Sequence, residues 1–342
     1  MHEEPPQVHD SGRPPAREGT AIMAPGAAES LPARRSIWSR ARHNSPFMFG
    51  AVLFLIVALI ATLVPFILQL DPYAVDTSRR LSGIGEEGYL LGSDDFGRDL
   101  LARLLVGAQT SLIVGASVAV LRGVLGTVIG ICASYFRVLD HILMRVCDGL
   151  MAIPAILLAI ALAAALGPSV PNLILALTVV FTPNVARLVR SRALAVLSET
   201  FVEASRVQGA PPLHIILRHV LPNTLSVLTV QVTFIFADSI ITEAALSFLG
   251  AGVPTPEPSW GNILNDGRGV ILQFPLMTVA ASLSLVVTVL ALNLLGDGLR
   301  DLVDPRSSGD DTRRGMVSRL FGRAPRTARR PRPAATEEST EP

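Results

Sequence analysis

The sequence predicts an all-α polytopic membrane protein with six transmembrane helices. Half of its 342 residues are hydrophobic and only 17% are charged, whereas about a quarter of the residues in a typical soluble domain carry charge. Apolar runs recur along the chain, and each is close to the roughly 20 residues that a helix needs to cross a bilayer. An isolated span must satisfy its backbone hydrogen bonds internally, so each run is expected to be a helix.

The six predicted spans follow one another between two polar tails. They cover about residues 47–69, 110–135, 143–166, 171–190, 222–249 and 275–297. The tails, 1–44 and 307–342, are rich in Pro, Arg, Glu and Ala without hydrophobic periodicity, and we expect them to be disordered. The first tail has no apolar run of its own and is not expected to be a secretory signal. One membrane domain is therefore predicted over residues 45–306.

Arginine placement predicts the orientation of the spans. Basic residues precede the first span, surround the second and fourth connections and follow the last span, whereas the odd connections are acidic or neutral. Because cytoplasmic loops carry the excess of positive charge, both termini and the fourth connection are predicted to face the cytoplasm.

The chain contains no lysine, since all 29 residues counted as Lys or Arg are arginine. A phosphate-binding loop of the G-x-x-x-x-G-K-[ST] type and Schiff-base chemistry both need a lysine. We therefore expect no cofactor on this chain, and any ATP and Mg²⁺ to be bound by another polypeptide. Cys132 and Cys147 show no metal spacing, so no metal site is predicted. The sequence also lacks H-E-x-x-H and G-x-S-x-G, and an intramembrane enzyme is not expected.

A polar segment, residues 200–225, separates the fourth and fifth spans. Thr200 and Glu203 fit a capping box and predict a short helix from Phe201 to Gln208. Gly209 is expected to end that helix in the left-handed conformation. A second short helix can then begin at the two prolines that follow.

The second short helix is expected to carry an apolar stripe, because its apolar residues fall at i, i+3, i+4 and i+7: Leu213, Ile216, Leu217 and Val220. Such a stripe on a projecting element is typical of a contact for another protein. The alternative is a bent linker whose stripe rests on the helix bundle or on the lipid interface.

The same segment resembles the loop E-A-A…G…I…L-P of bacterial ABC importer permeases. Further motifs match in order: LGSDDFGRD at 91–99, ARLVR at 186–190, RHVLPN at 218–223, EAALSFLG at 243–250, PSWG at 258–261, NLLGDGLRD at 293–301 and DPR at 304–306. Over about residues 44–306 the chain resembles the C-type permease of dipeptide, oligopeptide and nickel importers.

This resemblance implies a type I importer-like fold and a coupling loop at 193–221 that docks on an ATPase subunit. The residues carried over or predicted for that loop are Glu203, Ala204, Gly209, Leu213, Ile216, Leu217, His219, Leu221 and Pro222. The implied partners are a B-type permease subunit, two ATP-binding subunits, an extracytoplasmic binding protein and the lipid of a bacterial inner membrane, with no nucleic acid. The cargo is expected to be peptide, with nickel or another small solute as the alternative. An ion-coupled secondary transporter is the rival mechanism.

Charged residues inside predicted spans are candidates for the translocation path, because charge in a bilayer usually faces a bundle interior or water. Arg122 and Asp238 either pair with each other or with a partner permease, or one of them lines the path and meets a peptide terminus. Glu243 is expected in helix packing or in the path. Asp148 is expected to pair with Arg145 at i, i+3.

The fifth connection is predicted to be an ordered outer loop. Ser259 is a plausible N-cap for a short helix, and Trp260 is expected at the outer interface. The resemblance implies that this loop lies near a gate or near the docking surface for a binding protein.

Overall fold

The computed structural model describes residues 42, 44–86 and 88–303, all within the unit Ile37–Pro342. In this part of the chain the regular structure is helical, and the only β-type pairing is an isolated bridge between Ser93 and Asp99. The two tails that the sequence predicts to be disordered, 1–44 and 307–342, lie almost entirely outside the described residues.

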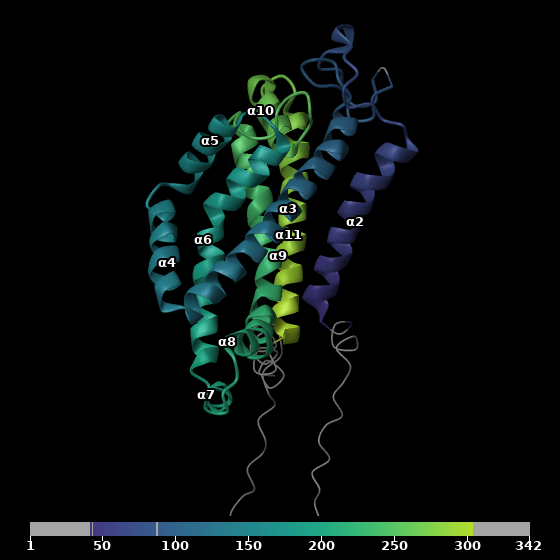
Figure 1. Ribbon diagram of the computed structural model, residues 1–342. Helices are drawn as coiled ribbons and strands as arrows, with labels where there is room; N and C mark the ends of the chain where they lie inside the picture. The colour runs from purple at the N-terminus through teal and green to yellow at the C-terminus, as the bar shows by residue number, and fades with distance from the viewer. Residues whose placement is uncertain (1–41, 43, 87, 304–342) are drawn as a thin grey trace, which may run out of the picture. The chain divides into compact units, whose positions relative to one another are not determined.

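Five helices of the described residues are long and apolar enough to cross a membrane. They are α2 (Ser45–Ile67), α3 (Leu100–Tyr135), α6 (Val170–Leu197), α9 (Leu221–Phe248) and α11 (Pro275–Val303). Helix α3 packs along α6 and α9, and α11 packs along α9 and α2 (Figure 1). The buried apolar side chains gather where these helices meet.

The region of the third predicted span, 143–166, is bent. That region forms two helices, α4 (Arg137–Met151) and α5 (Ala155–Leu166), which meet at 93°. Pro154 lies at the break, where it lacks an N–H to donate and its ring would clash with the preceding turn of a continuous helix. The described part therefore has five straight candidate spans, or six if the bent pair counts as one.

The second predicted span begins earlier than its hydropathy indicates. Helix α3 starts at Leu100, ten residues before the predicted start at 110, because Asp99 caps it by accepting from the backbone N–H groups of Leu101 (2.8 Å) and Ala102 (3.3 Å). The extra turns contain Arg103, which is buried. A buried arginine lowers the local hydropathy without interrupting the helix.

Glycines on α3 allow it to approach α6 closely. A Cβ built on Gly126 would lie 2.6 Å from Cβ of Val185, and one on Gly130 would lie 2.6 Å from the carbonyl oxygen of Ala186. No larger residue fits at either position without moving α6. This small-residue contact is what the G-x-x-x-G spacing predicts.

The shorter elements lie at opposite ends of the helices (Figure 1). At one end are the segment between α2 and α3, with its 3₁₀ turn Thr77–Arg79, and α10 (Trp260–Val270). At the other end are α7 (Thr200–Val207) and α8 (Pro212–Ile215). A π-helical turn, Ile216–Val220, joins α8 to α9 as one helical run.

Candidate functional site

Helix α7 is not started by the predicted capping box. The helix begins at Thr200, its N-cap residue is Glu199, and no side chain caps it. The backbone N–H groups of Val202 and Glu203 both donate to the carbonyl oxygen of Glu199, at 3.0 and 3.2 Å, so they do not need the Thr200 hydroxyl. Gly209 adopts φ +80° just beyond the end of the helix, which is the left-handed conformation that the sequence predicts.

The predicted apolar stripe of α8 is divided between two environments. Val220 is fully buried, whereas Leu213 and Leu217 are 65% and 54% exposed and Ile216 is half-buried. Ile215, which the 3.6-residue pattern leaves off the stripe, is buried instead. The π-helical turn at Ile216–Val220 accounts for the difference, because its wider turn shifts the side-chain register.

Four exposed apolar side chains come from α7, α8 and the π-helical turn, and together they are here called the α7–α8 surface: Phe201 (46% exposed), Val207 (84%), Leu213 and Leu217. The sequence analysis did not single out Phe201 and Val207. The sequence feature that could have identified them is the presence of two large apolar residues on a short helix that also carries Glu203 and Arg206. Glu203 and Ala204 are exposed beside them.

Buried side chains beneath this surface attach it to the long helices. Val202 of α7, Ile215 of α8 and Val220 belong to one cluster with Val185 and Val189 of α6. His219 adds a polar contact, with a ring nitrogen 3.3 Å from the Ser205 hydroxyl and its ring 5.6 Å from that of Phe201. Leu221 packs against the cluster, and Pro222 lies in the first turn of α9. The α7–α8 surface is therefore held on α6 and α9.

Arg122 and Asp238 pair with each other. Nη1 of Arg122, on α3, donates to Oδ2 of Asp238, on α9, at 3.0 Å, and the Ser239 hydroxyl lies 3.4 Å from the same nitrogen. The guanidinium also lies over the Phe181 ring of α6, 5.3 Å from its centroid. The Arg122 side chain is only 5% exposed, whereas that of Asp238 is 53% exposed.

Glu243 and Asp148 each have a different partner environment. Glu243 is fully buried and accepts from the Ser247 hydroxyl, one turn along α9, at 2.7 Å. Asp148 accepts from Arg187 of α6, so the expected pair with Arg145 was wrong. The cause is the bend, since the separate helix α4 lies beside α6; Arg190 likewise donates twice to Asp140, at 2.5 and 2.6 Å.

Trp260 is buried and not at an exposed interface, contrary to the sequence-based expectation. Ser259 caps α10 as predicted, with its hydroxyl accepting from the N–H of Asn262 at 3.2 Å. Helix α10 therefore begins at Trp260. The indole then points into the core and donates to the Leu104 carbonyl oxygen of α3 at 3.3 Å.

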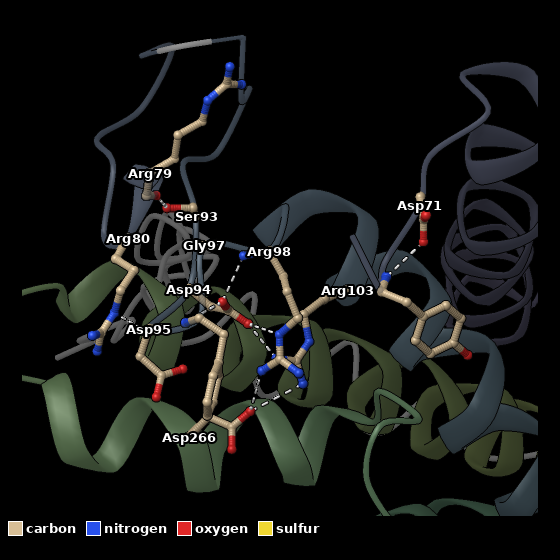
Figure 2. A network of polar contacts seen from close by, with 12 residues as sticks. Asp71, Arg79, Arg80, Ser93, Asp94, Asp95, Gly97, Arg98, Arg103 and Asp266 are labelled. Atoms are coloured by element: carbon tan, nitrogen blue, oxygen red, sulfur yellow. Dashed lines mark hydrogen bonds and ion pairs between the residues drawn. The ribbon is translucent and has the colours of Figure 1, made fainter. Parts of the chain in front are cut away.

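A buried ion-pair network joins the segment before α3 to α10 (Figure 2). Asp94 is its centre: it is fully buried and accepts from Nε of Arg98 at 2.7 Å, from Arg103, and from the backbone N–H groups of Phe96 and Arg98. Asp266 of α10 lies 3.4 Å from Arg98 and 3.1 Å from Arg103. The two arginines thus bridge the two carboxylates.

The network carries one more carboxylate than it has arginines, because Asp95 lies beside Asp94 and Asp266 (Figure 2). Burial raises the pKa of Asp266 to about 6, against the pull of Arg98. Burial and the charge of Asp94 raise the pKa of Asp95 as well. The sequence analysis included Asp94, Asp95 and Arg98 only in the motif at 91–99 and did not single out Asp266; the available signal was an arginine, Arg103, within an apolar helix.

Two family models match the chain. One describes the binding-protein-dependent transport system inner membrane component and covers residues 123–309, and the other describes the N-terminal transmembrane domain of oligopeptide transport permease C and covers residues 33–83. Together they span most of the membrane domain, and they confirm the resemblance seen in the motifs.

Curated relatives align along nearly their whole length. A putative peptide transport system permease protein of Brucella abortus is 48% identical over 290 residues, which are 84% of this chain and 96% of the relative. A glutathione transport system permease protein of Escherichia coli is 39% identical over 273 residues, covering 80% of this chain and 90% of the relative. A dipeptide transport system permease protein of Alkalihalophilus pseudofirmus is 35% identical over 306 residues, covering 89% and 98%.

The predicted fold class is confirmed by a solved structure of the MetNI methionine ABC transporter in inward-facing conformations. It matches with a TM-score of 0.50 and 23% identity, over 59% of this chain and 96% of that chain. At this identity the match shows the fold. With the family models and the relatives, it follows that the chain belongs to the binding-protein-dependent inner membrane components, the permease subunits of ABC importers.

Proposed function

We propose that this chain is one of two permease subunits in an ATP-driven importer of dipeptides or oligopeptides. The 48% identity to a peptide permease over 290 residues carries the proposal, because the match runs through the helices that build the membrane domain. The relatives named for dipeptide and glutathione transport support a peptide cargo. Nickel or another small solute is the alternative within the same machinery.

The α7–α8 surface is the proposed contact for an ATP-binding subunit. Phe201, Val207, Leu213 and Leu217 expose apolar area at one end of the bundle, and such area is suited to a groove in another protein. Buried contacts attach the surface to α6, and the helical run Pro212–Phe248 continues from it into α9. Closure of two ATPase subunits could then move α9, so that ATP binding biases a two-state bundle.

The proposed orientation places the α7–α8 end in the cytoplasm and the α10 end outside. The arginine-rich stretches before α2 and around the α7–α8 end support it, as do the acidic residues of the segment between α2 and α3. Both termini are then cytoplasmic in a bacterial inner membrane. An extracytoplasmic binding protein would dock at the α10 end, near the loop that precedes Trp260.

The proposed complex contains a B-type permease, two ATP-binding subunits and the binding protein. ATP and Mg²⁺ belong to the ATP-binding subunits, since this chain has no lysine for a phosphate-binding loop. The translocation path would lie between the two permeases, each contributing half.

Uptake by the reconstituted importer tests this function. The chain, its partner permease, the ATP-binding subunits and the binding protein are placed in liposomes with ATP enclosed, and uptake of a radiolabelled tripeptide is measured. We expect uptake that requires ATP and survives dissipation of the ion gradients by ionophores. Uptake abolished by the ionophores alone would identify a secondary transporter, and uptake of a nickel chelate without peptide uptake would reassign the cargo.

A further inference from the structure

Asp238 lies deep within a candidate span, yet its side chain is half exposed. Ten residues separate it from Phe248 at the end of α9, which corresponds to about 15 Å along the helix axis. A carboxylate exposed to hydrocarbon at such depth is strongly unfavourable, and charged groups in spans face water or protein instead. The face of α9 that carries Asp238 is therefore not a lipid-facing surface.

The neighbouring residues on this face include polar and small ones together with Ile241, which lies at i+3 and is 46% exposed. Gln231, Thr242 and Ala245 lie at i−7, i+4 and i+7 from Asp238, which places them on the same side of the helix, and all three are half-buried. By contrast, the exposed residues of α2 include Leu55, Ile56 and Leu63, and beyond the first turn its exposed polar residue, Thr62, donates to the carbonyl oxygen of Ala58 in its own helix at 2.7 Å. The exposed face of α9 thus carries a charged side chain, whereas the exposed face of α2 carries none.

Arg122 holds the carboxylate but is itself inaccessible. Its guanidinium is enclosed by α3, by Ser239 of α9 and by the Phe181 ring of α6. The exposed side of the Asp238 carboxylate therefore has a negative potential, because the compensating charge of Arg122 lies on its buried side. Within the described residues Oδ1 of Asp238 has no hydrogen-bond donor, which leaves it available to a second cation.

We propose that Asp238 is a binding subsite in the translocation path for the ammonium group of the transported solute, and that Arg122 is its positioning residue. The inference rests on the proposed function for the existence of the path, and it adds which chemical group at one end of the cargo is bound. A peptide's α-amino group, with an ordinary pKa near 8, is largely protonated at neutral pH. One exposed carboxylate gives a weak contact, as a path requires if the solute is to leave again. The buried Glu243 cannot share this role.

Thiol labelling beside Asp238 tests the electrostatic part of the proposal. Thr242 is replaced by Cys in a background with Cys132→Ala and Cys147→Ala, and the assembled importer is reacted in liposomes with a cationic trimethylammonium-ethyl or an anionic sulfonatoethyl methanethiosulfonate. After correction for their rates with a free thiol, we expect the cationic reagent to react about five times faster. In Arg122→Met/Asp238→Asn the ratio should return to about 1. Leu55→Cys, on the apolar face of α2, is the unreactive control.

Two labelling results would overturn the proposal. Equal corrected rates would show that Asp238 does not set the potential of this face. An unreactive Thr242→Cys, with or without ATP, would show that lipid or the second permease covers the face. Labelling does not depend on which cargo is carried, so a failure of the peptide assignment would leave a preference for the cationic reagent intact.

Transport by charge variants tests the ammonium contact. Asp238→Asn leaves Arg122 buried without its partner, so the double variant Arg122→Met/Asp238→Asn and the exchange Arg122→Asp/Asp238→Arg are compared with it, each checked for co-purification with the ATPase. We expect the assembled double variant to take up a free tripeptide about tenfold more slowly, and the exchange variant not to recover. Recovery in the exchange variant would show that the pair is structural only.

Discussion

Arg103 of α3 and Asp266 of α10 lie 3.1 Å apart, and together with Asp94 and Arg98 they connect the start of α3 to α10. Arg103 is buried along almost its whole length. Because Asp94 and Arg103 are almost fully buried and the Asp266 side chain is only 18% exposed, loss of one partner leaves a charge that solvent compensates poorly. The α10 end of the bundle therefore depends on a few ionic contacts as well as on apolar packing.

Replacing Arg103 by Met is expected to destabilise the protein strongly. The change leaves Asp94 and Asp266 with Arg98 alone, and breaking a buried pair in this way typically costs about 3–5 kcal/mol. Thermal unfolding of the detergent-purified importer measures the effect. The control is Arg79→Gln, which removes the exposed pair with Asp76 at 3.1 Å and should cost less than about 1 kcal/mol. Similar losses in both variants would contradict the network's role.

The stability of the importer is expected to fall as pH rises through the range in which Asp266 ionises. Its pKa in the folded protein is about 6, above the ordinary aspartate pKa of about 4, so the folded state binds the proton more readily. The contribution is fully present below about pH 4 and is lost as pH rises through 6. Allowing for partial solvent access, we expect a loss of about 1–2 kcal/mol.

Asp266→Asn isolates this pH dependence, because its side chain does not titrate. Apparent melting temperatures are compared at steps between pH 4 and 8. The variant should show a clearly flatter profile between pH 5 and 7, with the remaining slope in the same direction from Asp95, whose pKa is also raised. An unchanged slope would mean that Asp266 does not titrate in this range.

Leu217→Asp is expected to uncouple the permease from its ATPase without unfolding it. Leu217 is 54% exposed, so a carboxylate is tolerated in the free subunit but becomes buried when the α7–α8 surface docks. We expect at least a tenfold loss of ATPase co-purification and of substrate-stimulated ATP hydrolysis. Leu217→Met should retain both activities. Undiminished stimulation in the Asp variant would remove Leu217 from the contact.

Ile215→Asp separates docking from folding, because it places the same charge two residues away in a buried position. Ile215 packs against Val202 and the α6 side chains, so the charge should lower the melting temperature of the permease itself. A stable Ile215→Asp protein that failed only to dock would show that the buried and exposed sides of α8 are reversed.

Gly209→Ala is expected to cost about 1–2 kcal/mol through backbone strain alone. Gly209 has φ +80°, and a Cβ there would meet no atom within 4 Å, so no steric contact adds to the penalty. The matched control is Gly149→Ala inside α4, where the added Cβ also has open space but the backbone is helical. That change should be neutral or slightly stabilising. Melting temperatures of the two variants distinguish conformational strain from crowding.

Local chemistry made several elements predictable. The long apolar runs became helices because a bilayer leaves the backbone few other ways to satisfy its hydrogen bonds. Ser259 caps α10 and Gly209 ends the α7 region as their residue types indicate. The motif at 91–99 is one of the several motifs that indicated the family, but its ionic partner Asp266 lies far along the chain and shares no local pattern with it.

The differences from the sequence-based expectations arose where the helices depart from regular geometry. The bend at Pro154 turned one predicted span into two helices and gave Asp148 a partner on α6. The π-helical turn moved Ile215 inward and left Leu213 and Leu217 exposed. Trp260 was expected at an interface, but the start of α10 directs it into the core. None of these outcomes follows from hydrophobic periodicity, which assumes a regular helix.

By itself, the sequence determined the membrane class, the family and the absence of lysine chemistry, because composition and motif order are properties of the chain alone. Only the tertiary structure decided which charges are accessible. Arg122 and Asp238 look equivalent in the sequence, yet packing of α3, α6 and α9 encloses the guanidinium and leaves the carboxylate open. The physical reason is that the burial of a side chain depends on neighbours brought together from several helices. A carboxylate at a protein surface is accessible to a cation, whereas a buried carboxylate is not.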